Sequence, residues 1–228
     1  MDIVVDNDIP SSSFMQLHSL SAAHLNGSIV EVGSKIIDAQ GFTRFICILI
    51  PSESNNDFES ENKMKVKLDN LMQIPAVTSN DEVIEIGKKL DELESKYLFA
   101  QNDQRVAAIR KKKASTGYQE IATIYSTYKH LARVWLLKAS MALIFKTGSD
   151  RTNIYLQCMR RGVANIRNDF SMTDEKRHSK ILPTLLAYSS SAEDFGRPDI
   201  AQSALKMVVT SFPNHHSIVF LYGRLIVK

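Results

Sequence analysis

The chain has 228 residues, of which 44% are hydrophobic and 23% are charged, a composition typical of a globular protein with one large domain or a domain and an arm. The longest apolar stretch, 131–145, is shorter than the roughly 20 apolar residues that cross a bilayer, so a buried helix and no membrane contact are expected. The acidic start of the chain is unlike a secretory or organellar leader and favours a cytoplasmic location.

The net charge of +3 is unevenly distributed along the chain. Residues 1–63 contain three Lys/Arg and nine Asp/Glu, a net charge of −6, whereas residues 104–182 contain sixteen Lys/Arg and five Asp/Glu, a net charge of +11. This asymmetry indicates a polyanionic partner or charge-matched association between copies of the chain.

Residues 1–63 are predicted to form an acidic N-terminal arm that carries one β-hairpin and ends in a flexible linker. Residues 1–27 show no sustained period, and the only regular element expected there is a short helix over 14–25. Residues 28–37 and 42–50 are rich in β-branched and aromatic side chains, and the turn residues 38–41 between them predict the hairpin. The polar, acidic segment 51–62 is typical of a linker.

Residues 64–228 are predicted to form a helical bundle core, so the expected fold class is mainly α. The capping box from Ser79 to Glu82 precedes apolar residues spaced three and four apart, which predicts a helix of about 20 residues. The helix that contains Trp135 is expected to be the central core helix. Pro183 should divide the stretch 172–191 into shorter helices. Further helices are predicted over 103–113, 118–146, 151–169, 200–212 and 217–227.

Known catalytic and metal-binding patterns are missing from the sequence, so no enzyme, no metal and no cofactor is predicted. The glycines are scattered and form no phosphate-binding loop. The tripeptide Asp194-Phe195-Gly196 matches a kinase motif, but every other kinase motif is missing. No histidine pair has zinc-ligand spacing, and Cys47 and Cys158 lie in apolar patterns typical of buried thiols. A catalytic triad that assembles only in space stays open.

The basic middle segment supplies the candidate site, because its helices should pack together and bring several cations to one groove. Such a groove holds a phosphate backbone by charge neutralisation, and nearby tyrosines can stack bases. A structural role for these cations, as solvated helix faces and helix ends, is the alternative. The predicted nucleic-acid-binding residues are Arg110, Lys111, Lys112, Lys113, Lys129, Arg133, Arg151, Gln157, Arg160, Arg161 and Arg167.

The plan of an arm, a helical core and a basic groove is similar to that of coat proteins and nucleoproteins that cover single-stranded RNA in helical viral filaments. This resemblance of plan implies a non-enzymatic protein that binds single-stranded RNA and assembles into homo-oligomers through its N-terminal arm or hairpin, in the cytoplasm or in a virion. The alternative is a cytosolic α-helical adaptor whose basic face binds an acidic protein partner. The sequence leaves open the organism, the subunit number and the choice between RNA, DNA and an acidic protein.

Overall fold

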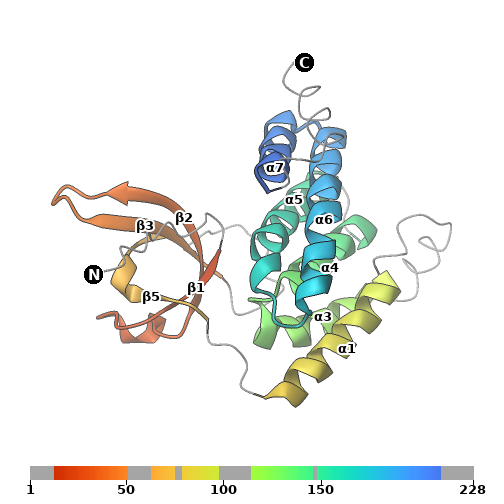
Figure 1. Ribbon diagram of the computed structural model, residues 1–228, viewed down its shortest axis with the longest axis horizontal. Coiled ribbons are helices and arrows are strands. Elements are labelled where there is room, and N and C mark those ends of the chain that lie inside the picture. Colours follow the sequence, from red (N-terminus) through yellow and green to blue (C-terminus); the bar gives the residue numbers. More distant parts are fainter. Residues whose placement is uncertain (1–12, 51–62, 75–78, 98–113, 146–147, 212–228) are drawn as a thin grey trace. The chain divides into compact units, whose positions relative to one another are not determined.

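The computed structural model describes residues 13–50, 63–74, 79–97, 114–145 and 148–211 (Figure 1). The chain divides into two compact units, Met1–Ala76 and Val77–Lys228, and each is described by itself. The expected mainly α class is confirmed, since the described residues form six α-helices beside one antiparallel sheet. The division lies after Ala76 and not at the expected position 63/64, because residues 63–72 belong to the sheet.

The N-terminal unit is a five-stranded antiparallel sheet with the strand order β4-β3-β2-β1-β5. The predicted hairpin corresponds to β2 and β3, but these strands lie within a larger sheet. The helix expected over 14–25 is wrong, since this segment forms β1 and the short 3-10 turn η1. The elements are β1 (Phe14–Leu17), η1 (Ala23–Leu25), β2 (Ile29–Ile37), β3 (Thr43–Leu49), β4 (Lys63–Lys67), η2 (Leu68–Asn70) and β5 (Leu71–Met72).

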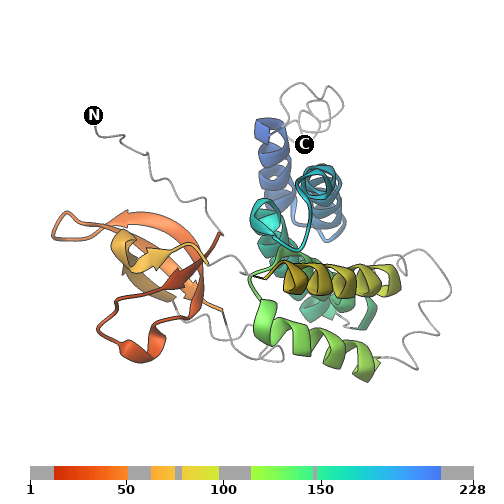
Figure 2. The ribbon, with the colours of Figure 1, turned by 60° about the horizontal axis from the view of Figure 1, so that its bottom comes forward.

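The sheet has to curl, because β4 and β5 are consecutive in the chain but lie at opposite edges (Figure 2). Four Cα steps from Lys67 to Leu71 reach at most about 14 Å, whereas the edges of a flat five-stranded sheet are about 19 Å apart. The connectivity is a four-stranded meander followed by a 3-10 turn and a last strand that returns to β1. The core on the inner face consists of Leu17, Val30, Val32, Phe45, Cys47, Val66 and Leu71.

Asp38 organises the turn between β2 and β3. Its Oδ1 accepts hydrogen bonds from the amides of Gln40 and Phe42 at 3.0 and 2.9 Å, and its Oδ2 accepts one from Nε of Arg44 at 2.5 Å. The Arg44 guanidinium therefore holds the pKa of Asp38 below its ordinary value. Gly41 has a φ of 82°, a backbone conformation that glycine adopts without strain.

The C-terminal unit is built from helices that pack along their neighbours in the chain. α4 packs on α5, and α6 packs on α7 (Figure 1). Gly162 permits the close approach of α5 to α4, because a Cβ atom there would lie 2.6 Å from Cδ2 of Leu136. The elements are α1 (Asn80–Tyr97), α3 (Ala114–Tyr128), α4 (Ala132–Phe145), α5 (Gly148–Asn165), η4 (Ile166–Asn168), α6 (Asp174–Asp194) and α7 (Pro198–Ser211).

The single helix predicted over 118–146 is wrong, because the chain turns between α3 and α4. The amide of Leu131 donates to the carbonyl of Tyr128 at 2.9 Å. The indole Nε1 of Trp135 donates to the carbonyl of Lys129 at 2.7 Å. A side chain thus takes the carbonyl that a continuous helix would have paired with a backbone amide, which stabilises the break.

The predicted interruption at Pro183 is also wrong, because α6 continues through this residue. Pro183 has no amide hydrogen, so the carbonyl of Ser179 has no donor four residues later in the helix. Thr173 caps the start of α6 by accepting a hydrogen bond from the amide of Lys176 at 3.3 Å.

The helices predicted near 80–97, over 151–169 and over 200–212 are confirmed as α1, as α5 with η4, and as α7. The predicted linker 51–62 and the predicted helices over 103–113 and 217–227 lie outside the described residues. Among the described helices, none has the length and the apolar character needed to cross a membrane.

Candidate functional site

The structure places seven of the eleven predicted RNA-binding residues. They lie on α4, on α5 and in the turns beside these helices. Two of the seven side chains are buried inside the helical unit, and five are at least partly exposed. The other four residues lie outside the described part of the chain: Arg110, Lys111, Lys112 and Lys113.

Arg133, on α4, is fully buried. Its guanidinium donates to Glu94 of α1 at 2.8 Å and pairs with Asp91 one turn earlier. It also donates to the carbonyl oxygens of Gly87 and Ser171, both at 3.3 Å. These contacts hold α1 and the turn before α6 against α4, so the structure gives Arg133 an internal role.

The two carboxylates that bind Arg133 also pair with α6. Lys176 pairs with Asp91, and Nζ of Lys180 donates to Glu94 at 2.5 Å. Burial by itself raises the pKa of Asp91, but Lys176 and Arg133 together hold it below its ordinary value. The result is a network of three cations and two carboxylates that connects α1, α4 and α6.

Arg161, on α5, is also buried and lies over the indole of Trp135, with 4.8 Å between the guanidinium carbon and the ring centre. The ring of Tyr125 meets the same indole edge-on at 5.4 Å. The ammonium of Lys138 lies 4.1 Å from the centre of the Tyr125 ring. Arg161 is therefore part of the packing between α4 and α5, through a cation–π contact.

The partly exposed residues of α5 and η4 are Arg151, Gln157, Arg160 and Arg167. Arg167 is exposed, and the other three are half-buried. The guanidinium carbon of Arg151 lies 6.0 Å from the centre of the Phe195 ring. Nε of Arg151 and Oε1 of Gln157 are buried atoms that make no hydrogen bond within the described part of the chain.

An aromatic cluster lies between α5 and the end of α6, beside these cations. The rings of Tyr155 and Phe195 meet edge-on at 5.7 Å, and the Tyr155 hydroxyl lies 2.9 Å from Oγ of Ser191. Burial raises the pKa of Tyr188 to about 12, and the charges of Arg160 and Arg197 oppose that rise. Arg160 therefore acts electrostatically on the α5–α6 interface.

A cavity of about 290 Å³ opens between α4, α5 and α6. Its floor is formed by buried residues of α4 and α5, and its outer wall by exposed small residues of α6. The sequence analysis did not identify it, although small side chains at positions 179, 183 and 187 of α6 follow the helical spacing of four. The lining residues are Leu136, Ser140, Tyr155, Met159, Ser179, Lys180, Pro183, Thr184 and Ala187.

Lys129 and His130 lie in the turn between α3 and α4. Burial lowers the pKa of Lys129. Burial also lowers the pKa of His130, with Lys129 adding to the effect and Asp169 opposing it. The His130 ring lies 5.5 Å from the ring of Phe170, centre to centre.

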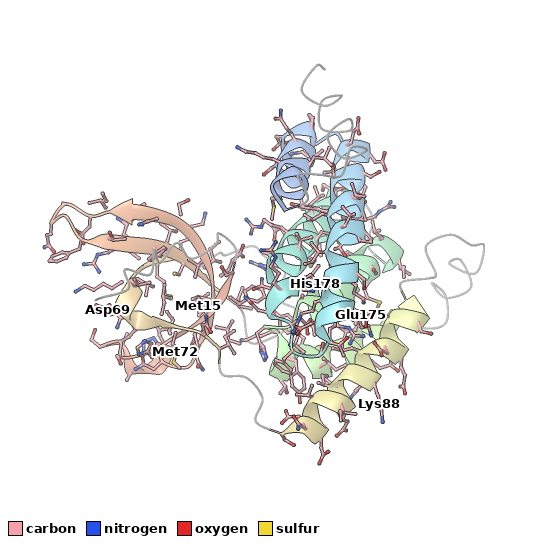
Figure 3. All side chains as sticks on the ribbon, in the orientation of Figure 1. Met15, Asp69, Met72, Lys88, Glu175 and His178 are labelled. Carbon is pink, nitrogen blue, oxygen red and sulfur yellow. The ribbon has the colours of Figure 1, made fainter. Side chains whose placement is uncertain are left out.

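The depressed pKa of His130 predicts a loss of stability in mild acid. The unfolded chain binds a proton near pH 6.5, whereas the folded chain binds it at lower pH, so the free energy of unfolding falls as the pH drops from about 7 through this window. The His130→Phe variant removes the titrating group. We expect its melting temperature to fall less between pH 7.5 and 5.5 than that of the wild type, whereas a parallel fall in both proteins would contradict the assignment. The exposed His178, labelled on α6 in Figure 3, provides the control His178→Phe.

The two cysteines of the described ranges, Cys47 and Cys158, are free and buried. Burial raises the pKa of the Cys47 thiol to about 12 and also raises the pKa of Cys158, so both thiols stay protonated at neutral pH. No group of three or more His, Cys, Asp or Glu side chains within the described ranges is arranged to hold a metal ion.

Comparisons with protein-family models, with curated sequences and with solved structures each gave no match. The candidate site consequently rests on its own geometry: the α4–α5–α6 cavity and the partly exposed cations of α5.

Proposed function

We propose that this chain is a non-enzymatic protein-interaction adaptor whose helical unit binds an acidic segment of a partner protein. The observation that carries the proposal is the apolar cavity between α4, α5 and α6, with the partly exposed Arg151 one helical turn before the lining residue Tyr155 on α5. An apolar cavity with a few polar groups at its edge is typical of a binding site.

The arrangement of the helices supports this proposal. α4 and α5 form one helix hairpin, α6 and α7 form the next, and the two hairpins meet through α5 and α6. Stacked helix hairpins are the building plan of α-solenoid proteins, which present extended surfaces to other proteins.

The distribution of the arginines favours an acidic protein over a nucleic-acid strand. Arg133 and Arg161 are engaged inside the helical unit. Among the described residues predicted to bind RNA, three arginines are at least partly exposed: Arg151, Arg160 and Arg167. Coating a strand requires neutralisation of many phosphates, whereas a few partly exposed cations are enough for a short acidic segment.

A self-assembling RNA-binding protein is the second candidate, and one observation favours its assembly step. Ile37 and Phe42 lie at the end of the β2–β3 hairpin and are 75% and 55% exposed. An exposed apolar pair on a projecting hairpin is suited to contact another subunit.

The first test removes the surface cations of α5. In a variant with Arg151→Gln, Arg160→Gln and Arg167→Gln, we expect a fluorescein-labelled acidic peptide of about 12 residues to bind at least about tenfold more weakly. Each exposed ion pair between an arginine and a peptide carboxylate contributes up to about 1 kcal/mol to binding, and 1.4 kcal/mol corresponds to tenfold in affinity. Fluorescence anisotropy at 150 mM salt measures the change.

The matched control replaces three exposed lysines outside α5 and η4 with Gln, and so produces the same change in net charge. These lysines are Lys65, Lys88 and Lys89. Lys88 is labelled on α1 in Figure 3. Equal weakening in both triple variants would contradict a specific site on α5. Purified protein that carries RNA, shown by its 260/280 nm absorbance ratio before and after RNase, and that binds single-stranded RNA more tightly than the peptide would favour the second candidate.

A further inference from the structure

We propose that the cavity between α4, α5 and α6 holds an apolar side chain of the acidic partner segment, while the carbonyl of Ser179 accepts a main-chain hydrogen bond from that segment and Arg151 binds one of its carboxylates. The inference rests on the proposed function and specifies the partner: an extended segment with one aliphatic anchor and a nearby acidic residue.

The shape and lining of the cavity fit an aliphatic side chain. Leu136, Tyr155 and Met159 form the floor and are each at most 7% exposed. Pro183 and Ala187 form an exposed wall on α6. The volume of about 290 Å³ lies at the lower end of the range of small-molecule sites, so the cavity has room for a single large side chain and some main chain.

Pro183 removes one internal hydrogen bond from the α6 wall of this cavity. Because proline has no amide hydrogen, α6 cannot pair the carbonyl of Ser179 with the residue four positions later. Ser179 and Pro183 both line the cavity. An extended peptide presents an N–H group at every residue except proline, so it brings a matching donor together with its side chain.

The cations at the two ends of the cavity differ in their partners. At the end of the cavity formed by Ser179 and Lys180, the ammonium of Lys180 is paired with Glu94 at 2.5 Å. The charge of Lys180 is therefore already neutralised by a carboxylate of the chain. Beyond Ala187, the helix continues to Ser191, whose Oγ lies 2.9 Å from the Tyr155 hydroxyl, and ends at Asp194. The ring of the next residue, Phe195, lies 6.0 Å from the guanidinium carbon of Arg151. The end near Arg151 is therefore the place for a carboxylate.

The geometry sets the spacing between the anchor and the acid. From Ala187 to Phe195 the helix rises about 12 Å, at 1.5 Å per residue. An extended chain covers this distance in about four residues, at about 3.3 Å per residue. The partner segment should therefore carry its acidic residue about four positions from its apolar anchor.

The probe is a fluorescein-labelled peptide of about 12 residues that contains one Leu and a Glu four positions away, prepared with both orders of the two residues. We expect the full chain to bind the better of these two peptides at least about tenfold more tightly than a peptide in which Ser replaces Leu, and several-fold more tightly than one in which Leu and Glu are adjacent. Anisotropy titrations measure these ratios.

Two protein variants test the cavity itself. Ala187→Leu fills it and should weaken binding about tenfold, and Pro183→Ala restores the internal hydrogen bond of Ser179 and should weaken binding several-fold without destabilising α6. Ser190→Leu adds the same bulk at an exposed position of α6 that is not part of the cavity lining and should leave the affinity unchanged. Circular dichroism melting checks that each variant is folded.

The outcomes separate this inference from the proposed function. If the triple arginine variant loses the peptide while Ala187→Leu and Pro183→Ala bind it normally, the proposed function stands and the role of the cavity is overturned. If neither set of variants alters binding, both are overturned. If Ala187→Leu and Ser190→Leu weaken binding equally, or if single-stranded RNA displaces the peptide and binds more tightly, the cavity is not the site of an acidic protein segment.

Discussion

Arg133→Met should lower the free energy of unfolding by about 3–5 kcal/mol, because it leaves Glu94 and Asp91 without their buried cation. Glu94 is the more affected partner, since it is only 8% exposed. The variant also removes the donors to the carbonyl oxygens of Gly87 and Ser171. Urea unfolding followed by circular dichroism at 222 nm measures the loss in the helical unit.

The control for this prediction is Lys176→Met, which removes a cation that pairs with Asp91 at the surface. Both partners of that ion pair are partly exposed, so its loss should cost no more than about 1 kcal/mol. Equal losses in the two variants would contradict the internal role of Arg133. The double variant Arg133→Met with Glu94→Gln should recover part of the stability, because it removes the buried charge that the single substitution leaves unpaired.

Local sequence signals predicted most of the helices but few of the strands. α1 follows a capping box, and α7 begins at Pro198, so side chains close in sequence determine where they start. The strand β4, Lys63–Lys67, alternates charged and apolar residues, the period of a half-buried strand. The strand was nevertheless missed, because the helical core was predicted to begin at residue 64 and so included most of these five residues. β5 has two residues, too few for any periodic signal.

The candidate site could be predicted only in part, because burial depends on which helices pack together. Arg160 and Arg161 are adjacent on α5 and have nearly the same sequence context, yet a turn of about 100° directs them differently. Arg161 lies over Trp135, whereas Arg160 is half-buried on the side where its charge acts on Tyr188. The basic side of α5 was predictable from its periodicity, but the residue that turns inward was not.

The small residues at positions 179, 183 and 187 could not by themselves predict the cavity, because its lining comes from three helices that meet only after folding. Pro183 was expected to end a helix, since it lacks an amide hydrogen. Packing of α6 against α5 and α7 offsets the lost hydrogen bond, and the helix continues. Pro183 therefore leaves the carbonyl of Ser179 without its usual helical donor but does not end the helix.

Trp135→Ala should lower the free energy of unfolding by about 3–5 kcal/mol, the cost of deleting a fully buried tryptophan. The substitution removes the edge-on contact with Tyr125 and the surface on which Arg161 lies. It also leaves the carbonyl of Lys129 without the indole donor, so the turn between α3 and α4 loses its cap.

Trp135→Phe separates these contributions, because it keeps an aromatic ring for Tyr125 and Arg161 but has no N–H group for the Lys129 carbonyl. We expect it to lose about 1–3 kcal/mol, the cost of an unsatisfied acceptor and a smaller ring. Chemical denaturation followed by circular dichroism measures both variants. If Trp135→Ala unfolds at the same denaturant concentration as the wild type, α4 is not the central core helix, and the contacts of its indole do not hold α3, α4 and α5 together.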